Sequence, residues 1–241
     1  GAGMGDDYYG TLNGDPEGIN AYVAAVNAAG YQVQIHAMGD GAVHTALDAY
    51  EQSLEANGPA DYRNIITHVT LITDEDKQRM GEMDVIAAMQ PMWFYYDPMF
   101  SPLEEQNFGS ERFATEYLVR DMMDAGIMIT GSADYPITED NPLDAIEAGV
   151  TQCSPFPGEE DDEAFLRNPD QGATPLEALK WYTTNGAYQM EMEDLIGTIE
   201  VGKKADLTVL GANILTCDTK EINEAGVRYT ISDGRIVYQN N

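Results

Sequence analysis

Residues 31–51 read YQVQIHAMGDGAVHTALDAYE, and this stretch contains the unit from which the fold is built. Its first part, residues 31–36, alternates in the manner of a β-strand. The second part places Val43, Leu47 and Tyr50 on one face of a helix, because they recur at helical spacing. The sequence therefore predicts a strand that is followed directly by a helix.

The same unit recurs along the first two thirds of the chain. Predicted strands cover residues 31–36, 64–68, 85–90 and 127–130. Predicted helices follow the N-caps Asp15 and Thr73, cover residues 111–125 and 143–150, and run from Thr174 to Tyr188. Strands that alternate with helices predict an α/β fold with a parallel sheet and right-handed crossovers.

The last part of the chain has a different pattern. Residues 197–210 and 229–238 are typical of strands, and the second stretch contains Asp233-Gly234, a signal for a hairpin turn. A small β module is therefore expected after the α/β part. Residues 97–109 and 154–172 are rich in Pro, Gly and acidic residues and are predicted to be long loops.

Potential metal ligands stand at the ends of three predicted strands. His36 and His68 close two of them, and Asp134 lies just past the fourth. In a (β/α) barrel the carboxyl ends of the strands meet at one mouth, so these side chains are expected to converge. Imidazole and carboxylate suit zinc and similar divalent ions. The spacing alone leaves open whether the histidines are ligands or satisfied polar residues. The third histidine, His44, is predicted to be a surface or supporting residue.

The charge balance is strongly acidic, with 42 acidic residues, 12 basic residues and a formal net charge of −30. Such a surface repels nucleic acids and anionic membranes, so neither is expected as a partner. A solvated acidic surface is one interpretation. The other is adaptation to salt, because counterions screen the repulsion between carboxylates.

Other features of the composition favour a cytoplasmic protein. No apolar run approaches the length of a bilayer span, and residues 1–7 show no basic region followed by an apolar stretch. Cys153 and Cys217 stand in no CxxC pattern and are expected to be free thiols.

Four motifs resemble those of amidohydrolase family 3, a group within the amidohydrolase superfamily of metal-dependent hydrolases. They occur in the family's order and together span nearly the whole chain. They are HAMGD at 36–40, MQP at 89–91 with Trp93, DYPIT at 134–138 with NPL at 141–143, and GTIEVGKKADLTVL at 197–210.

The resemblance implies a TIM-like (β/α)8 barrel with a β-sandwich built from both chain ends. Residues 1–195 would form the C-terminal half of the barrel, and residues 196–241 part of the sandwich. By resemblance, His36, His68 and Asp134 fall on metal ligands, and Asp134 also handles the proton. Gln90 would face the substrate, and Trp93 would form an apolar wall of the pocket unless it only packs beneath the loop.

The resemblance also implies the cofactor and the reaction. One or two divalent ions, zinc first among them, would activate water for hydrolysis of a C–N bond in a small-molecule amide-type substrate, other than a peptide bond. The chain departs from the family in one respect: the His-x-His of the first strand and the bridging ligand are missing, so the chain is expected to be an inactive fragment by itself. A half barrel exposes sheet edges and apolar helix faces, so we also expect self-association into a homo-oligomer.

Two alternatives stay open. The chain could be a non-catalytic regulatory or binding relative that keeps the fold without a complete metal site. It could also belong to a barrel whose strand-end histidines serve another metal reaction, such as that of an isomerase or a deaminase, because fold does not fix function.

Overall fold

The computed structural model describes residues 11–160 and 162–240, which form two compact units. Within the described residues, unit 1 comprises residues 11–89 and 98–129, and unit 2 comprises residues 90–97, 130–160 and 162–240. The predicted boundary between residues 195 and 196 separates the barrel from the sandwich and not two compact units, so it is not tested by this division and stays a prediction. Residues 1–7, whose sequence shows no signal-peptide pattern, lie outside the described part of the chain.

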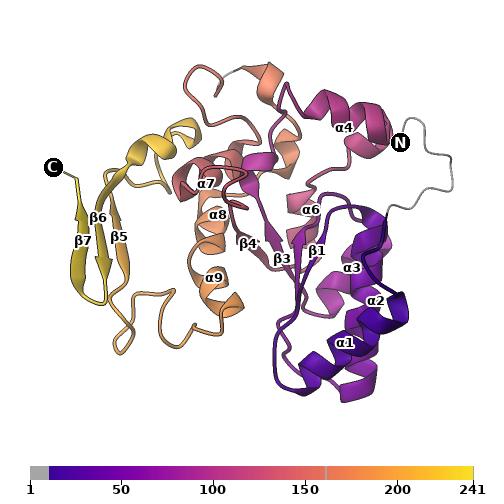
Figure 1. Cartoon of the computed structure of the whole chain (residues 1–241). Helices are drawn as coiled ribbons and strands as arrows, with labels where there is room; N and C mark the ends of the chain where they lie inside the picture. The colour runs from indigo at the N-terminus through magenta and orange to yellow at the C-terminus, as the bar shows by residue number, and fades with distance from the viewer. Residues whose placement is uncertain (1–10, 161, 241) are drawn as a thin grey trace. The chain divides into compact units, whose positions relative to one another are not determined.

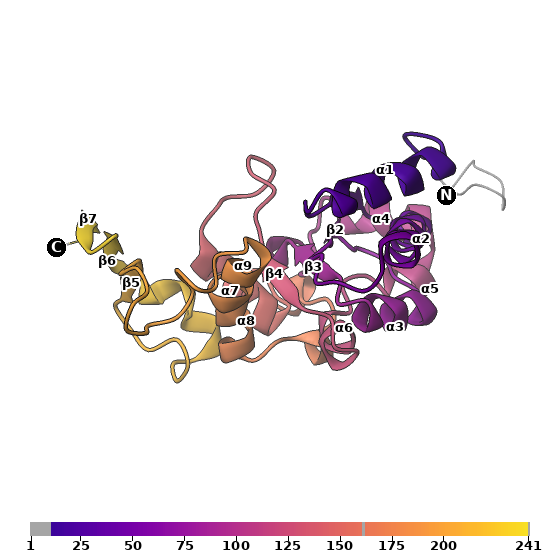
Figure 2. The same ribbon diagram turned by 90° about the horizontal axis from the view of Figure 1, so that it is seen from below.

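Unit 1 is an α/β unit whose strands and helices alternate along the chain. Its strands are β1 (Gln34–Ala37), β2 (Ile65–His68) and β3 (Ile86–Met89), and β4 (Ile129–Gly131) begins in it. Its helices are α1 (Pro16–Ala28), α2 (Asp40–Asn57), α3 (Asp74–Glu82), α4 (Ser101–Phe108), α5 (Ser110–Phe113) and α6 (Val119–Asp124). The sheet order is β1-β2-β3-β4, with β1, β2 and β3 parallel. Helices α1, α2 and α3 lie on one side of these strands (Figures 1 and 2).

Capping residues place the helices of unit 1 as the sequence predicts. The Asp15 carboxylate accepts a hydrogen bond of 3.0 Å from the Gly18 N–H at the start of α1. The Thr73 hydroxyl accepts one of 3.1 Å from the Asp76 N–H at the start of α3. These side chains satisfy N–H groups that a helix leaves without partners in its first turn, so they fix where each helix begins.

A buried amide pair ties α1 and α2 to the start of β2. Asn27 and Asn64 exchange two side-chain hydrogen bonds, each of 3.0 Å. The Ser53 hydroxyl on α2 donates to the Asn27 oxygen at 2.8 Å, and the Val33 N–H donates to the Asn64 oxygen at 3.1 Å. Because all these groups are buried and bonded, they fix the level at which β1 and β2 enter the sheet.

Two predictions for unit 1 are wrong. Residues 97–109 are not a loop throughout, since α4 occupies most of them. The predicted helix 111–125 is divided into α5 and α6, because Tyr117 has a φ of 54° and its N–H donates to the Thr70 carbonyl at 3.0 Å. Tyr117 is also buried, so tertiary contacts outweigh helix propensity at this point.

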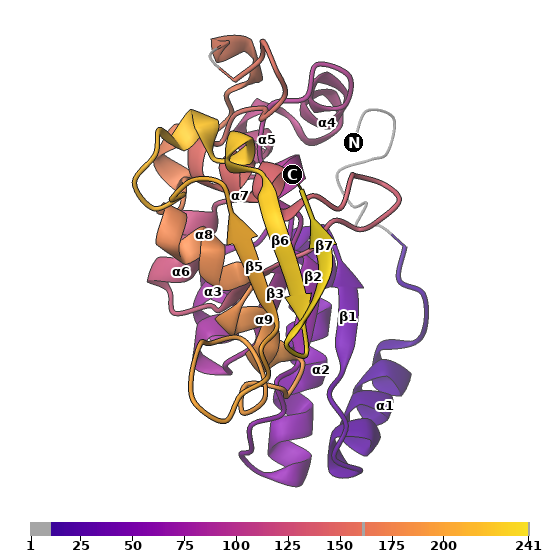
Figure 3. The same ribbon diagram turned by 90° about the vertical axis from the view of Figure 1, so that its left-hand side faces the viewer.

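Unit 2 combines short helices with a small antiparallel sheet. Its strands, side by side in Figure 3, are β5 (Leu207–Leu210), β6 (Val227–Ser232) and β7 (Arg235–Gln239), in the order β5-β6-β7. Its α-helices are α7 (Pro142–Thr151), α8 (Pro175–Trp181) and α9 (Thr184–Gln189). Its 3₁₀ turns are η1 (Pro91–Trp93), η2 (Glu163–Phe165), η3 (Pro169–Gln171), η4 (Thr219–Glu221) and η5 (Asn223–Ala225).

Most of the predicted features of unit 2 are confirmed, with two differences in extent. Asp233-Gly234 forms the turn between β6 and β7, and the described residues of 154–172 contain only the short turns η2 and η3. Strand β5 covers only the last four residues of the predicted strand 197–210. The predicted helix from Thr174 to Tyr188 is interrupted at Thr183, whose ψ of −94° is not helical.

Two further findings concern composition. No helix in the described part of the chain is long and apolar enough to cross a bilayer. Cys153 and Cys217 are free, as predicted, and Cys153 is buried.

Candidate metal centre

His36 and His68 stand side by side at the carboxyl ends of β1 and β2. His68 Nε2 lies 2.8 Å from His36 Nδ1, and the ring centroids are 4.3 Å apart at an interplanar angle of 76°. His68 is buried, whereas His36 is exposed. The structure therefore brings together two of the three residues that the sequence singles out.

An unusual backbone conformation makes this meeting possible. In the register of β1 and β2, His36 is paired with Thr67, so His68 should point to the opposite face of the sheet. His68 instead has a φ of 80°, in the left-handed region that few residues other than glycine adopt. This conformation ends the strand alternation and turns the His68 ring toward His36.

The turn after His68 is held by β1. Val69 also has a positive φ, 50°, which is rare for a β-branched residue and costs on the order of 1–3 kcal/mol. Its N–H donates to the Ala37 carbonyl at 3.1 Å, and the Leu71 N–H donates to the Met38 carbonyl at 3.0 Å. Strain that is held in place by surrounding bonds is common at functional sites.

The chemistry of the histidine pair fits a divalent metal. At 2.8 Å one ring nitrogen donates a proton that the other accepts, so the two nitrogens already lie beside each other. Neutral imidazole nitrogens are common zinc ligands, and His36 and His68 are the residues that would hold such an ion.

The pair does not make a complete site. Among residues 11–160 and 162–240, no three His, Cys, Asp or Glu side chains gather in a way that could hold a metal ion. Zinc sites use three or four protein ligands. The histidines would therefore supply only two of the ligands, and their assignment as ligands stays a prediction.

Asp134 belongs to unit 2, where it follows β4 on a tight turn. Its side chain is exposed, and its φ of 53° lies in the left-handed region. The Ile137 N–H donates to the Asp134 carbonyl at 2.9 Å. The turn thus presents the carboxylate to solvent, as a proton-transfer group or a ligand requires.

Gln90, predicted to face the substrate, is buried at 1% exposure in unit 2. Its amide nitrogen donates to the Ser132 hydroxyl at 2.7 Å, two residues before Asp134. An unpaired buried amide costs about 1–3 kcal/mol, so this bond fixes both side chains. Sequence analysis missed Ser132, because nothing in the sequence indicates which buried group an amide will bind.

Trp93 packs within unit 2. It is half-buried against a cluster of Met92, Tyr95, Ala145 and Ala148, to which Tyr182 also belongs. The sequence left two roles open for Trp93, a wall of the substrate pocket or packing beneath the loop. The contacts in unit 2 are those of a packing residue. The sequence did not indicate Tyr182 either. Gly131 was the available signal, because a glycine in a strand often marks a place where another group approaches the backbone closely. A Cβ on Gly131 would lie 2.3 Å from the Tyr182 ring.

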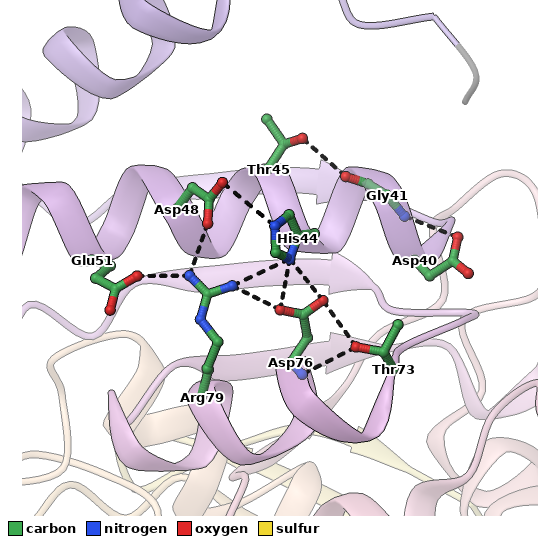
Figure 4. Close-up of polar contacts among 9 residues, drawn as sticks. All are labelled: Asp40, Gly41, His44, Thr45, Asp48, Glu51, Thr73, Asp76 and Arg79. Carbon is green, nitrogen blue, oxygen red and sulfur yellow. Dashed lines mark hydrogen bonds and ion pairs between the residues drawn. The ribbon is translucent and has the colours of Figure 1, made fainter. Parts of the chain in front are cut away.

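His44 has a structural environment (Figure 4). Its Nδ1 lies 3.0 Å from Asp76 on α3, and Arg79 lies 2.8 Å from the carboxylates of Asp76, Asp48 and Glu51. Burial alone would lower the pKa of Arg79, but hydrogen bonds to these carboxylates raise it above its ordinary value. The network joins α2 to α3.

The chain was compared with known proteins. Residues 2–238 match the model of a family described as "Amidohydrolase family". The chain is 29% identical over 231 residues to Protein LONG AFTER FAR-RED 3 of Arabidopsis thaliana, covering 95% of this chain and 38% of that protein. It is 28% identical over 211 residues to the N-substituted formamide deformylase of Arthrobacter pascens, covering 87% and 37%.

A solved structure shares the fold. A metal-dependent hydrolase from Pyrococcus horikoshii OT3 superimposes with a TM-score of 0.73 at 25% identity, covering 88% of this chain and 40% of that one. With the four-stranded parallel sheet and the separate antiparallel sheet, this confirms the predicted fold, part of a TIM-like barrel followed by part of a β-sandwich. The chain spans less than half the length of these relatives.

Proposed function

The chain belongs to the amidohydrolase family, and from that premise we propose that the protein hydrolyses a C–N bond, other than a peptide bond, in a small amide-type substrate. The observation that carries the proposal is the histidine pair at the ends of β1 and β2, with ring nitrogens 2.8 Å apart. A pair of imidazoles brought into contact by a strained turn is more than core packing requires.

His36 and His68 are the residues that would hold a divalent metal, zinc first among the choices. The bound ion would supply Lewis-acid activation of water and of the substrate carbonyl. The buried position of His68 and the bonds that fix its turn keep its ring from rotating away. Asp134 is proposed as a further ligand.

Asp134 is also proposed as the proton-transfer group. When the water oxygen bonds to the carbonyl carbon and the C–N bond breaks, one water proton must reach the leaving nitrogen. A carboxylate accepts that proton and then delivers it. The exposed side chain of Asp134, on a turn that its own carbonyl closes, is suited to this exchange.

The substrate class follows from the reaction and from a relative. The deformylase of Arthrobacter pascens is named for N-substituted formamides, which contain the bond proposed here. The acidic composition of the chain disfavours polyanionic substrates. A neutral or cationic amide, formamide or acylated amine is therefore the proposed substrate.

The test uses the full-length protein and measures zinc content and amide turnover. His36→Ala and His68→Ala should each lower both at least about tenfold, because each removes one ligand. Asp134→Asn should lower turnover by about 100-fold or more while substrate binding is kept.

His44→Gln is the matched control, because His44 lies in the network of α2 and α3. It should leave zinc content and turnover within about twofold of the parent, as a surface substitution generally does. If His36→Ala and His68→Ala retain full zinc content, the histidine pair is not the metal site. If the parent protein neither binds zinc nor turns over any amide, the non-catalytic alternative replaces the proposal.

A further inference from the structure

The turn that carries Asp134 is fixed at several points within unit 2. The Thr138 hydroxyl donates to the Ala133 carbonyl, and the Ile137 N–H donates to the Asp134 carbonyl at 2.9 Å. With the positive φ of Asp134, these bonds define one conformation of residues 133–138. They are local bonds, however, and do not set where the turn stands relative to the rest of unit 2.

Two side-chain bonds anchor the entry to the turn. The Thr130 hydroxyl on β4 donates to the Gln189 side chain on α9. Two residues later, Ser132 accepts from the Gln90 amide at 2.7 Å. Between them, Gly131 lies against the Tyr182 ring, which leaves no room for a side chain. Residues 130–132 are thus held by three other segments of the unit.

The Gln90–Ser132 bond is the anchor nearest to Asp134. Gln90 is only 1% exposed, so its amide is enclosed by the protein and bonds to Ser132 away from solvent. Its position directly after β3 is rigid, because Pro91 begins the turn η1. A fixed donor on a rigid element is suited to positioning a neighbouring loop.

We propose that Gln90 and Ser132 are positioning residues that act as one unit, holding the Asp134 turn in the orientation that proton transfer requires. Gln90 then acts on the reaction through Ser132 and Asp134 and not by contact with the substrate. This inference rests on the proposed function, because it assigns Asp134 its role in the reaction.

The kinetic test uses the full-length enzyme and compares Gln90→Met, Ser132→Ala and the double variant. Gln90→Met keeps the length of the side chain and removes the donor, and Ser132→Ala removes the acceptor. Each single variant should lower kcat by about 10–100-fold with little change in KM, because misplacement of a reactive group costs turnover more than binding. The double variant should be no slower than the slower single variant, since both remove the same bond.

Ser132→Thr keeps the hydroxyl and should restore kcat to within about threefold of the parent. A rise in KM at unchanged kcat in Gln90→Met would show direct substrate binding and overturn the proposal. Effects that multiply in the double variant would overturn it as well, because the two residues would then act independently.

A second measurement does not depend on activity. Backbone hydrogen exchange of residues 131–138 should become at least about tenfold faster in Gln90→Met and in Ser132→Ala, and should stay at the parent rate in Ser132→Thr. Ser154→Ala is the control, because Ser154 is a buried hydroxyl elsewhere in unit 2 that is bonded to Glu159 at 2.6 Å. It should leave exchange at residues 131–138 unchanged.

The two measurements separate the possible failures. Unchanged exchange at residues 131–138 in both variants overturns the positioning role. Faster exchange with no turnover in the parent enzyme supports the Gln90–Ser132 anchor and removes only the proposed function.

Discussion

At the scale of the residue, Gly131 tests how closely unit 2 is packed around β4. An added Cβ would lie 2.3–2.7 Å from three atoms of the Tyr182 side chain, which is itself packed against the cluster that contains Met92 and Tyr95. Gly131→Ala should therefore lower the free energy of unfolding by about 1–3 kcal/mol, the usual cost of overpacking. Urea denaturation followed by tryptophan fluorescence measures it, because Trp93 and Trp181, the two tryptophans, both belong to unit 2.

Gly186→Ala on α9 is the control for this substitution. Its Cβ would meet only a backbone oxygen at 3.5 Å, an ordinary contact, and alanine favours helix by up to about 1 kcal/mol. The stability of Gly186→Ala should equal or exceed that of the parent. Equal stabilities of Gly131→Ala and the parent would show that Tyr182 moves aside freely.

The sequence predicts only those residues of the candidate site that stand at the ends of strands. His36 and His68 could be found because each closes a strand-like run, and parallel strands place such residues at one edge. The φ of 80° at His68 could not be found, because no glycine or asparagine marks it. Hydrogen bonds to residues at the end of β1 hold this conformation, and they join parts of the chain that are far apart in sequence. For the same reason the Gln90–Ser132 bond has no signature in the sequence.

At the scale of the element, α7 and the segment between β5 and β6 are joined by a buried carboxylate. Glu147 on α7 is 1% exposed and accepts a hydrogen bond of 2.9 Å from the Asn223 N–H. The pKa of Glu147 is raised to about 7, chiefly by burial; the negative charges of Asp144 and Glu160 contribute to the rise, and the backbone hydrogen bonds oppose it. Glu147 thus changes charge near neutral pH.

The raised pKa of Glu147 predicts a pH dependence of stability. Because the folded pKa, about 7, exceeds the ordinary value of 4.5, the contribution of Glu147 is present in full below pH 4.5 and is lost as the pH rises through 7. Between pH 5 and pH 8 the free energy of unfolding of unit 2 should fall by about 1–3 kcal/mol from this group.

Glu147→Gln isolates this effect, because glutamine keeps the shape and the acceptor for Asn223 but has no charge. Tryptophan-monitored urea titrations at pH 5 and pH 8 should show a smaller fall in stability in Glu147→Gln than in the parent. Equal pH dependence of the two proteins would place the titration elsewhere.

The starts of the capped helices were predicted correctly, whereas a break set by tertiary contact was not. Asp15 and Thr73 cap helices with their own side chains, so local sequence determines where α1 and α3 begin. The break between α5 and α6 depends on the bond from Tyr117 to Thr70, 47 residues earlier in the chain. A bond over that separation leaves no local trace in the sequence.

At the scale of the whole molecule, the excess of acidic residues over basic ones sets the response to salt. The formal net charge is −30, and ion pairs such as those of Arg79 involve only a few of the 42 acidic residues. The expected self-association stays a prediction. Repulsion between such acidic chains opposes it, and salt screens that repulsion, so self-association should be more favourable at high ionic strength.

Salt should also stabilise the fold. The screening length is about 10 Å at 0.1 M salt and about 3 Å at 1 M, so repulsion between surface carboxylates is nearly removed over that range. Repulsion opposes the compact state more than the unfolded chain, whose charges lie farther apart. The melting temperature should therefore rise by a few degrees, on the order of the 2–4 °C that 1 kcal/mol gives in a protein of 150–250 residues. Calorimetry in NaCl and in choline chloride at equal ionic strength separates screening from effects of a particular cation.

A charge-reduced variant is the sharpest control for screening. Glu82, Glu111 and Glu139 are exposed, and replacing all three with glutamine removes three negative charges without removing buried contacts. The triple variant should melt higher than the parent at 0.1 M salt and should gain less between 0.1 M and 1 M, because less repulsion remains to be screened. A parent melting temperature that does not rise with salt would show that repulsion is already balanced locally, and the acidic surface would then serve solubility and not salt adaptation.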